Sequence, residues 1–191
     1  MIGNNENGAT YNGFDRQWTG GATVGGPIIK DKLFFFVSAE KSKQIGGGSP
    51  YGPEGSGASV TVDGLTPDQI QQVRDIAASK YGINDIGTYG GGSTDLVDKR
   101  YLGKIDWNIS DNHRARFTYS ITHEAKPTIG GSSTKLVLSS GWYNSITKNT
   151  SYALHFYDDW SDSFSTDTTL SYAKFSKNNS PVAGGDLPDI T

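Results

Sequence analysis

The chain has 191 residues, a formal net charge of −3 and no cysteine, and hydrophobic residues make up 34% of it. An acidic chain without clustered Lys and Arg lacks the electrostatic footprint of nucleic-acid binding, so we expect no nucleic-acid partner. No apolar run approaches the length of a transmembrane helix, but strands that cross a membrane need only every second residue to be apolar. The 25 glycines and 10 tyrosines are typical of strands, turns and interfacial aromatic residues.

Residues 1–15 are predicted to be an N-terminal segment that leads into the first strand. Its start, MIGNNEN, is polar and lacks the basic and apolar regions of a secretory signal peptide. A newly made exported protein carries such a segment. The chain is therefore expected to be mature, truncated or not exported.

Alternating side chains predict six strands, arranged as three hairpins over residues 16–177. The predicted pairs are 16–29 with 32–43, 100–109 with 113–123, and 142–157 with 164–176. Each strand has about ten residues or more, which is roughly the length that a tilted strand needs to cross a bilayer.

The clearest hairpin lies between Arg100 and His123, around a turn at residues 110–112. One of its faces is aromatic and aliphatic, and the other is nearly all polar. The apolar side chains include Tyr101, Ile105, Trp107, Phe117, Tyr119 and Ile121. This pattern is typical of an outer-membrane barrel that is apolar outside and polar inside. A surface hairpin on a soluble sheet also alternates, so this hairpin alone leaves both interpretations open.

The connections between strands alternate between short and long. The predicted turns at residues 30–31, 110–112 and 158–162 are short, whereas residues 44–97 and 125–140 form long loops and residues 178–191 begin another. Outer-membrane barrels have short periplasmic turns and longer extracellular loops. The alternation therefore favours a barrel in which the three long segments are extracellular.

The first long loop is predicted to contain a helix over residues 66–81. Thr66 can cap the helix, Pro67 suits the first helical position, and Gln69 completes a capping box. Gly82 is expected to end the helix. The spacing of four side chains predicts an apolar stripe that packs on the loop or the barrel mouth, or else on a partner or ligand. These side chains are Ile70, Val73, Ala77 and Tyr81.

The stretch Gly25–Phe36, GGPIIKDKLFFF, resembles the start of the barrel in Oar-like TonB-dependent outer-membrane transporters. The stretch 98–113, DKRYLGKIDWNISDNH, is similar to the recurring strand and turn of that family. The resemblance covers residues 18–119 well and the rest loosely. It implies a barrel of about 22 strands, a plug domain, a segment that contacts TonB, and often a carboxypeptidase-regulatory-like domain at the N-terminus. It also implies a receptor in the bacterial outer membrane that binds a substrate outside and imports it into the periplasm.

Six strands are too few to close a single-chain barrel, since the smallest has about eight. An open edge in lipid would leave backbone groups unpaired, at a cost of several kcal/mol each. The predicted fold is therefore all-β: part of an antiparallel up-and-down transmembrane β-barrel, with one loop helix, within a longer protein. Expressed alone, this fragment is expected to aggregate or to need detergent.

Charged side chains on the polar face are the candidate binding residues, and in a barrel they would line the lumen. They are Arg100, Lys104, Asp106, Arg114 and Arg116. Such charges can bind plug carboxylates or guide an anionic substrate. The alternative is that they are only solvated in a wet interior. Phe34 and Phe36 share a face with Ser38 and Glu40, which is reasonable packing if a plug fills the barrel.

The sequence contains no catalytic constellation that we recognise, and we expect no enzyme activity, cofactor or metal. His113, His123 and His155 lack metal-ligand spacing. The acidic cluster at residues 158–162 does not have the EF-hand pattern, and the glycine runs are not followed by the Lys-Ser/Thr of a phosphate loop.

Two further interpretations remain. A secreted or cell-surface β-rich binding module, for carbohydrate as one example, would use exposed Trp and Tyr side chains as stacking platforms. A hydrolase on a β-scaffold would need an acid/base pair, and none occurs at a convincing spacing.

Overall fold

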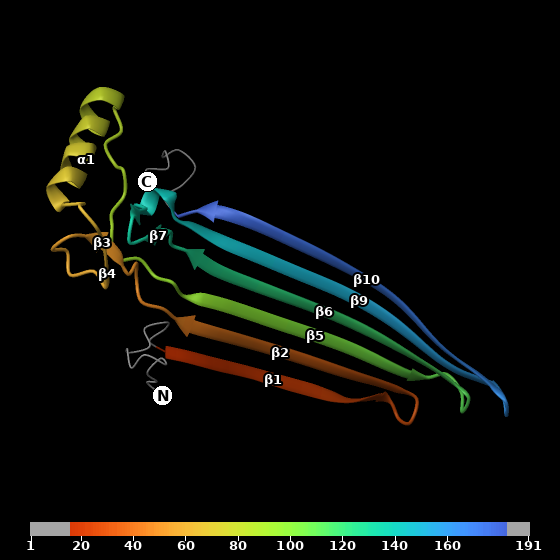
Figure 1. Cartoon of the computed structure of the whole chain (residues 1–191). Coiled ribbons are helices and arrows are strands. Elements are labelled where there is room, and N and C mark those ends of the chain that lie inside the picture. Colours follow the sequence, from red (N-terminus) through yellow and green to blue (C-terminus); the bar gives the residue numbers. More distant parts are fainter. Residues whose placement is uncertain (1–15, 183–191) are drawn as a thin grey trace.

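The computed structural model describes residues 16–182, and its main feature is one antiparallel sheet of six strands (Figure 1). The strands are β1 (Arg16–Ile29), β2 (Leu33–Ile45), β5 (Leu96–Asn108), β6 (His113–Thr128), β9 (Tyr143–Ser161) and β10 (Phe164–Pro181). Their spatial order, β1-β2-β5-β6-β9-β10, follows their order along the chain. The six predicted strands and the all-β class are therefore confirmed. The sheet is open, because β1 and β10 each have a strand partner on one side only among the described residues.

The register gives the sheet two chemically different faces. Directly opposite residues share a face, so the pairs Phe35–Ile105, Ile105–Phe117, Phe117–Leu154 and Leu154–Leu170 form one apolar row across five strands. We call this side the apolar face. The next row toward the long loops contains Val24, Val37, Gly103, Tyr119, Tyr152 and Tyr172.

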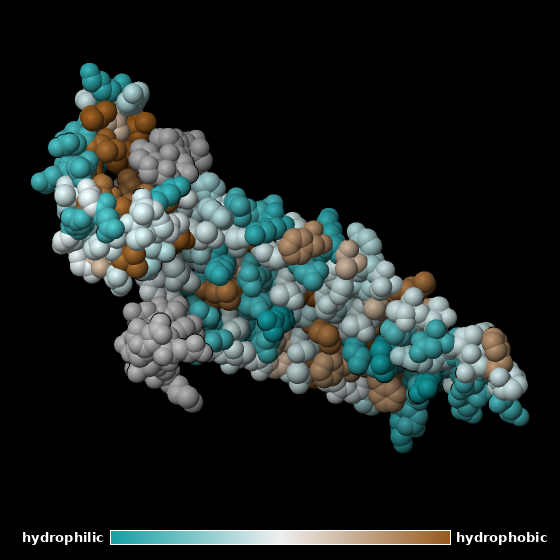
Figure 2. All heavy atoms as spheres, in the orientation of Figure 1, coloured by the Kyte–Doolittle hydropathy of each residue, from teal (hydrophilic) through white to brown (hydrophobic). Residues whose placement is uncertain are grey.

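The other side, the polar face, carries mostly Ser, Thr, Asn and charged residues. Figure 2 views the sheet from a side on which hydrophilic and neutral spheres predominate. Large side chains on the apolar face are nonetheless exposed: Leu170, for example, keeps 60% of its surface accessible. Within residues 16–182, no second layer of secondary structure covers this face.

The short turns all lie at one end of the sheet and the long loops at the other (Figure 1). The turns span residues 30–32, 109–112 and 162–163, and the long loops span residues 46–95 and 129–142. The predicted turn at residues 158–162 was wrong in extent. Asp158 and Asp159 continue β9 because they pair with Thr166 and Ser165 of β10.

The predicted loop boundaries were also too wide. The β6–β9 ladder continues to Thr128 and Tyr143, which shortens the loop predicted at 125–140. Likewise, β10 continues through Pro181, so residues 178–181 are strand and not the start of a loop. The predicted N-terminal segment 1–15 and residues 183–191 lie outside the described part of the chain.

The two long loops pack together into a small folded unit, which we call the loop layer (residues 46–95 and 129–142). It contains β3 (Tyr51–Pro53) beside β4 (Val60–Val62), helix α1 (Pro67–Tyr81), β7 (Gly131–Ser132) beside β8 (Lys135–Leu136), and the 3-10 helix η1 (Ser139–Gly141). Figure 1 shows this layer beyond the loop end of the sheet.

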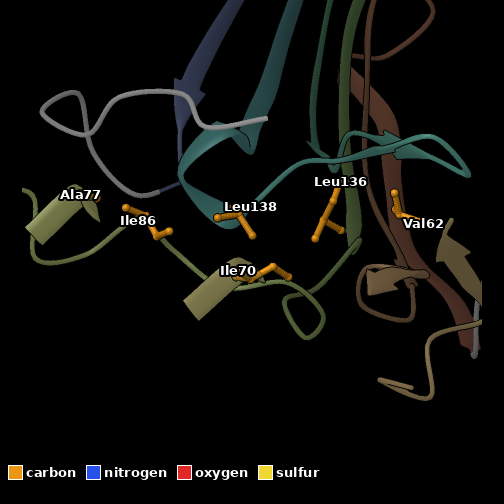
Figure 3. Packing of buried hydrophobic residues seen from close by; sticks show 6 residues of the cluster. All are labelled: Val62, Ile70, Ala77, Ile86, Leu136 and Leu138. Atoms are coloured by element: carbon orange, nitrogen blue, oxygen red, sulfur yellow. The ribbon is translucent and has the colours of Figure 1, made fainter. Parts of the chain in front are cut away.

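The loop layer, and not the sheet, holds the hydrophobic core of the described residues. Figure 3 shows Leu136 and Leu138 from the second loop beside Val62, Ile70 and Ile86 from the first. Ile86 is the most deeply buried of them, with 1% of its surface exposed. The two loops are therefore held together by burial of apolar side chains.

Polar contacts join the same two loops. The Thr88 backbone N–H donates to Ser139 Oγ at 2.9 Å, and the Ser139 N–H donates back to the Thr88 carbonyl at 2.9 Å. Gly92 has a φ of 75°, and a Cβ there would lie 2.6 Å from the ring of Trp142. A glycine is needed at this position because of both the left-handed backbone and the close ring.

The predicted helix ends are confirmed. Thr66 and Gln69 form the capping box, and Gly82 ends α1 in the left-handed conformation with a φ of 68°. The predicted apolar stripe is correct for Ile70 and Ala77, which are buried. Val73 and Tyr81 are 42% and 75% exposed, so the described residues do not bury them, and their contact with a partner or ligand stays a prediction. Figure 2 shows hydrophobic spheres on one side of α1 and hydrophilic spheres on the other.

Within residues 16–182, no helix is both long enough and apolar enough to span a membrane.

An ion pair ties the base of the first long loop, with Lys43 Nζ 2.7 Å from Asp95 Oδ2. The hydrogen bond from Lys43, followed by one with Ser93, lowers the pKa of the Asp95 carboxyl below its ordinary value of 3.8. Because the pKa is lower in the folded protein, this pair stabilises the loop base at any pH above 3.8, and the contribution is lost as the pH falls through the lowered pKa.

The amide of Gly46 offers a direct measurement, since its N–H donates to Asp95 Oδ1 at 3.3 Å. We expect the Gly46 amide chemical shift to follow the titration of Asp95 during acidification, with a midpoint below 3.8. Asp95→Asn should remove this titration. A Gly46 titration that persists in Asp95→Asn would contradict the assignment.

Candidate functional site: the polar face of the sheet

All five candidate binding residues lie on the polar face. Arg100, Lys104 and Asp106 belong to β5, and Arg114 and Arg116 belong to β6. Residues two apart on a strand are separated by about 7 Å, so Arg100 and Asp106 lie about 20 Å apart along β5. The five residues therefore share a face, but Arg100 lies near its loop end, Asp106, Arg114 and Arg116 lie near the short turns, and Lys104 lies between them. Their role in binding stays a prediction.

A cluster of charged and aromatic side chains lies near the short turns. Asp106 and Arg116 are directly opposite in the β5–β6 ladder, and Arg116 Nε donates a hydrogen bond to Asp106 Oδ1. The guanidinium of Arg114 lies 5.6 Å from the centre of the Tyr157 ring, within the range of a cation–π contact. With Phe34, these residues line a depression of about 250 Å³. We call Phe34, Asp106, Arg114, Arg116 and Tyr157 the turn-end cluster.

His155 extends this cluster onto β9 and β10. It lies directly opposite Arg116, and its ring stacks on Tyr157 with centroids 5.7 Å apart. The Thr169 hydroxyl is 3.0 Å from His155 Nδ1, and Asp167 Oδ1 is 3.9 Å from the same nitrogen. No group of three or more His, Asp or Glu side chains that could hold a metal ion occurs in residues 16–182.

A second group of charges lies at the loop end of the polar face. Arg100 Nη2 donates to Asp98 Oδ2 at 2.6 Å, and Arg100 Nη1 lies 3.6 Å from Glu40 Oε1. Asp98 is buried, and its Oδ1 has no hydrogen-bond partner among the described residues. We call Glu40, Asp98 and Arg100 the loop-end cluster.

Asp98 and Glu40 were missed as site residues. A signal for Asp98 was present, because it precedes Arg100 by two positions on one strand and so shares its face. Glu40 had no such signal, since its position opposite Arg100 follows from the β2–β5 register, which spans the long first loop.

Lys104 lies between the two clusters. Its direct neighbours across the sheet are Phe36 and Thr118, and it makes no ion pair with any residue in the described part of the chain. Phe34, Phe36 and Tyr157 place aromatic side chains beside the cations of this face, so a partner with both apolar and anionic groups fits best.

The polar face can therefore contact a partner at both ends and in the middle. Its guanidinium groups can bind carboxylates or phosphates, and its carboxylates can accept hydrogen bonds from a cationic or hydroxylated group.

Comparison of the chain with family models, with curated proteins and with solved structures gave no match.

Proposed function

We propose that this sheet is the early part of the barrel of an outer-membrane TonB-dependent receptor and transporter. The observation that supports this best is the uncovered apolar face, which crosses all six strands, opposite a polar face. In a membrane barrel the apolar face contacts lipid and the polar face lines the lumen. The protein then binds a substrate at the cell surface and imports it into the periplasm.

The lengths of the strands support the same proposal. Each of the six has at least 13 residues, and a tilted strand needs about 9–11 to cross the hydrocarbon core. The short turns are then periplasmic and the loop layer is extracellular.

The open edges of the sheet fit a larger barrel. Unpaired N–H and C=O groups along β1 and β10 would each cost several kcal/mol in lipid. Further strands of the same protein, paired to these two edges, would satisfy them. The number of strands needed for closure is at least about eight.

The polar face has a defined role in this proposal. The turn-end cluster and Phe36 contact a plug domain, and the TonB system supplies the energy that moves this plug. The loop layer makes the first contact with the substrate, because loops carried on a rigid sheet are where binding residues concentrate.

Cysteine labelling tests the proposal, because the chain has no cysteine of its own. Phe117 lies on the apolar face and Thr118, its neighbour in β6, lies on the polar face. In native outer membranes, we expect Phe117→Cys to resist a charged, water-soluble maleimide and to react with a lipid-soluble one. Thr118→Cys should react with the water-soluble reagent.

The pair of variants is its own control, since both positions are at nearly the same depth. Equal reaction of both cysteines with the charged reagent, or recovery of the protein in the soluble fraction, would contradict the membrane barrel.

One observation favours a second candidate, a cell-surface module that binds carbohydrate. Tyr119, Tyr152 and Tyr172 lie side by side on the apolar face, with ring centroids 5.1 and 6.3 Å apart. Such a row of rings can stack on sugar units. This candidate requires a monodisperse protein without detergent, and binding of a soluble polysaccharide that is lost in Tyr152→Ala.

A further inference from the structure

Four basic residues lie side by side on the apolar face, on the loop side of the apolar rows. Lys41 of β2 is directly opposite Lys99 of β5, Lys99 is opposite His123 of β6, and His123 is opposite Lys148 of β9. We call these four the cationic row. Lys99 and His123 are the next pair on this face after Tyr101 and Ile121, on the side of the long loops. The cationic row therefore lies about 7 Å along the strands from the nearest apolar residues.

The cationic row has no internal countercharge. Lys41 and Lys99 are like charges directly opposite on neighbouring strands, which destabilises a sheet, and the three lysines of the row are all exposed. None of the four residues makes an ion pair within residues 16–182. The strand residues around the row on this face are neutral or basic, and Glu40, Asp98 and Glu124 lie on the polar face. The remaining nearby acid, Asp95 at the base of the first long loop, is paired with Lys43 and not with the row. An external anion would remove the repulsion.

One end of the row joins a depression that has an aromatic floor. Lys148 and Lys174 line it on the loop side, and Tyr119, Tyr152 and Tyr172 line it toward the apolar rows, around a volume of about 350 Å³. Lys174 is exposed and lies one residue pair closer to the short turns than Lys148, through its pairing with Thr150. The site therefore places cations directly beside an apolar, aromatic surface.

We propose that the cationic row and the Lys148–Lys174 depression bind the phosphate groups of anionic membrane lipids. The proposal rests on the proposed function, because it needs the apolar face to be in contact with a bilayer. Charge complementarity identifies the occupant: lipid phosphates lie at the edge of the hydrocarbon layer, which is where the row lies relative to the apolar rows. Lysine stems can lie along the apolar surface while their ammonium groups reach these phosphates. The tyrosine rings contact the start of the acyl chains.

Spin-labelled lipids provide the test. The protein is reconstituted into phosphatidylcholine bilayers with a trace of spin-labelled phosphatidylglycerol or spin-labelled phosphatidylcholine, and electron spin resonance measures the fraction of label immobilised at the protein surface. We expect phosphatidylglycerol to be preferred. The variant that combines Lys148→Gln and Lys174→Gln should lower this preference by up to about fivefold for each lysine. The preference should also fall as salt is added.

Lys177→Gln is the matched control. Lys177 belongs to the same strand as Lys174 and is also exposed, but it lies on the polar face opposite Thr147. This variant removes one lysine charge, as each of the two substitutions in the test variant does, and should leave the lipid preference unchanged.

The outcomes separate this proposal from the one on which it rests. Equal immobilisation of the two lipids, or a preference that survives loss of Lys148 and Lys174, would overturn the lipid site and leave the membrane barrel intact. Absence of any immobilised lipid would overturn both.

Discussion

Replacing Leu170 by arginine is expected to destabilise the inserted sheet by about 2–4 kcal/mol. Leu170 lies on the apolar face of β10, in the row that also contains Phe117 and Leu154. It is 60% exposed, so in water an arginine there would cost little. In a bilayer the same side chain would place a charge in hydrocarbon. Denaturant unfolding of the protein folded into lipid vesicles measures the difference.

Ser171→Arg is the matched control for this substitution. Ser171 is the next residue in β10, is also exposed and lies on the polar face opposite Ala153. In a water-filled lumen the added charge should change stability by less than about 0.5 kcal/mol. A similar small effect of both variants would argue that the apolar face does not contact lipid.

Replacing Ile86 by alanine is expected to destabilise the loop layer by about 2–5 kcal/mol. Ile86 is 1% exposed and packs in the cluster with Ile70 and Leu138, so truncation leaves a cavity between the two long loops. Amide hydrogen exchange should accelerate in residues 46–95 and 129–142. Exchange in the strands of the sheet should not change, because the cluster draws only on loop residues.

Ile76→Ala is the corresponding surface control. Ile76 belongs to α1 but is 53% exposed, so its truncation should change exchange little. Equal acceleration in the two variants would show that the loop layer is not held together by its buried cluster. Acceleration throughout the sheet in Ile86→Ala would show that the loops and the sheet unfold as one unit.

The strands and the helix could be predicted because their signals are local. Alternation, together with the apolar run from Leu33 to Val37, located the six strands of the sheet. Four residues, Thr66, Pro67, Gln69 and Gly82, marked both ends of α1. The strand ends could not be predicted in the same way. Asp158 and Asp159 resemble a turn in the sequence, and only pairing with β10 keeps them extended.

The loop layer could not be predicted because its contacts are distant in sequence and have no period. Nothing near Ile86 indicates that Leu138, from the other loop, will cover it. The exposed Val73 and Tyr81 illustrate the same difficulty. Helical spacing identifies an apolar stripe, but the area that the stripe buries depends on the size of the surface that it meets.

In the candidate site, too, the contacts within one hairpin could be predicted and the contacts between distant strands could not. The Asp106–Arg116 pair follows from the register of one tight hairpin, which the sequence indicates directly. The cationic row was not predicted, because it is visible only when the registers of β2, β5, β6 and β9 are combined. The predicted binding residues all belong to the polar side of a single hairpin, whereas the lysines of the opposite face belong to several strands.

The up-and-down order of the strands allows the long loops to vary in length and sequence. Each strand of the sheet pairs with its neighbour along the chain, so a loop only has to reconnect two adjacent strand ends. The entropy of closing a flexible loop grows only with the logarithm of its length, and closing residues 46–95 instead of a loop as short as 129–142 costs about 1 kcal/mol more. Insertions and deletions in the long loops therefore change the stability of the sheet little. Homologous proteins can acquire new recognition surfaces there while their strands remain under the constraints of the two faces.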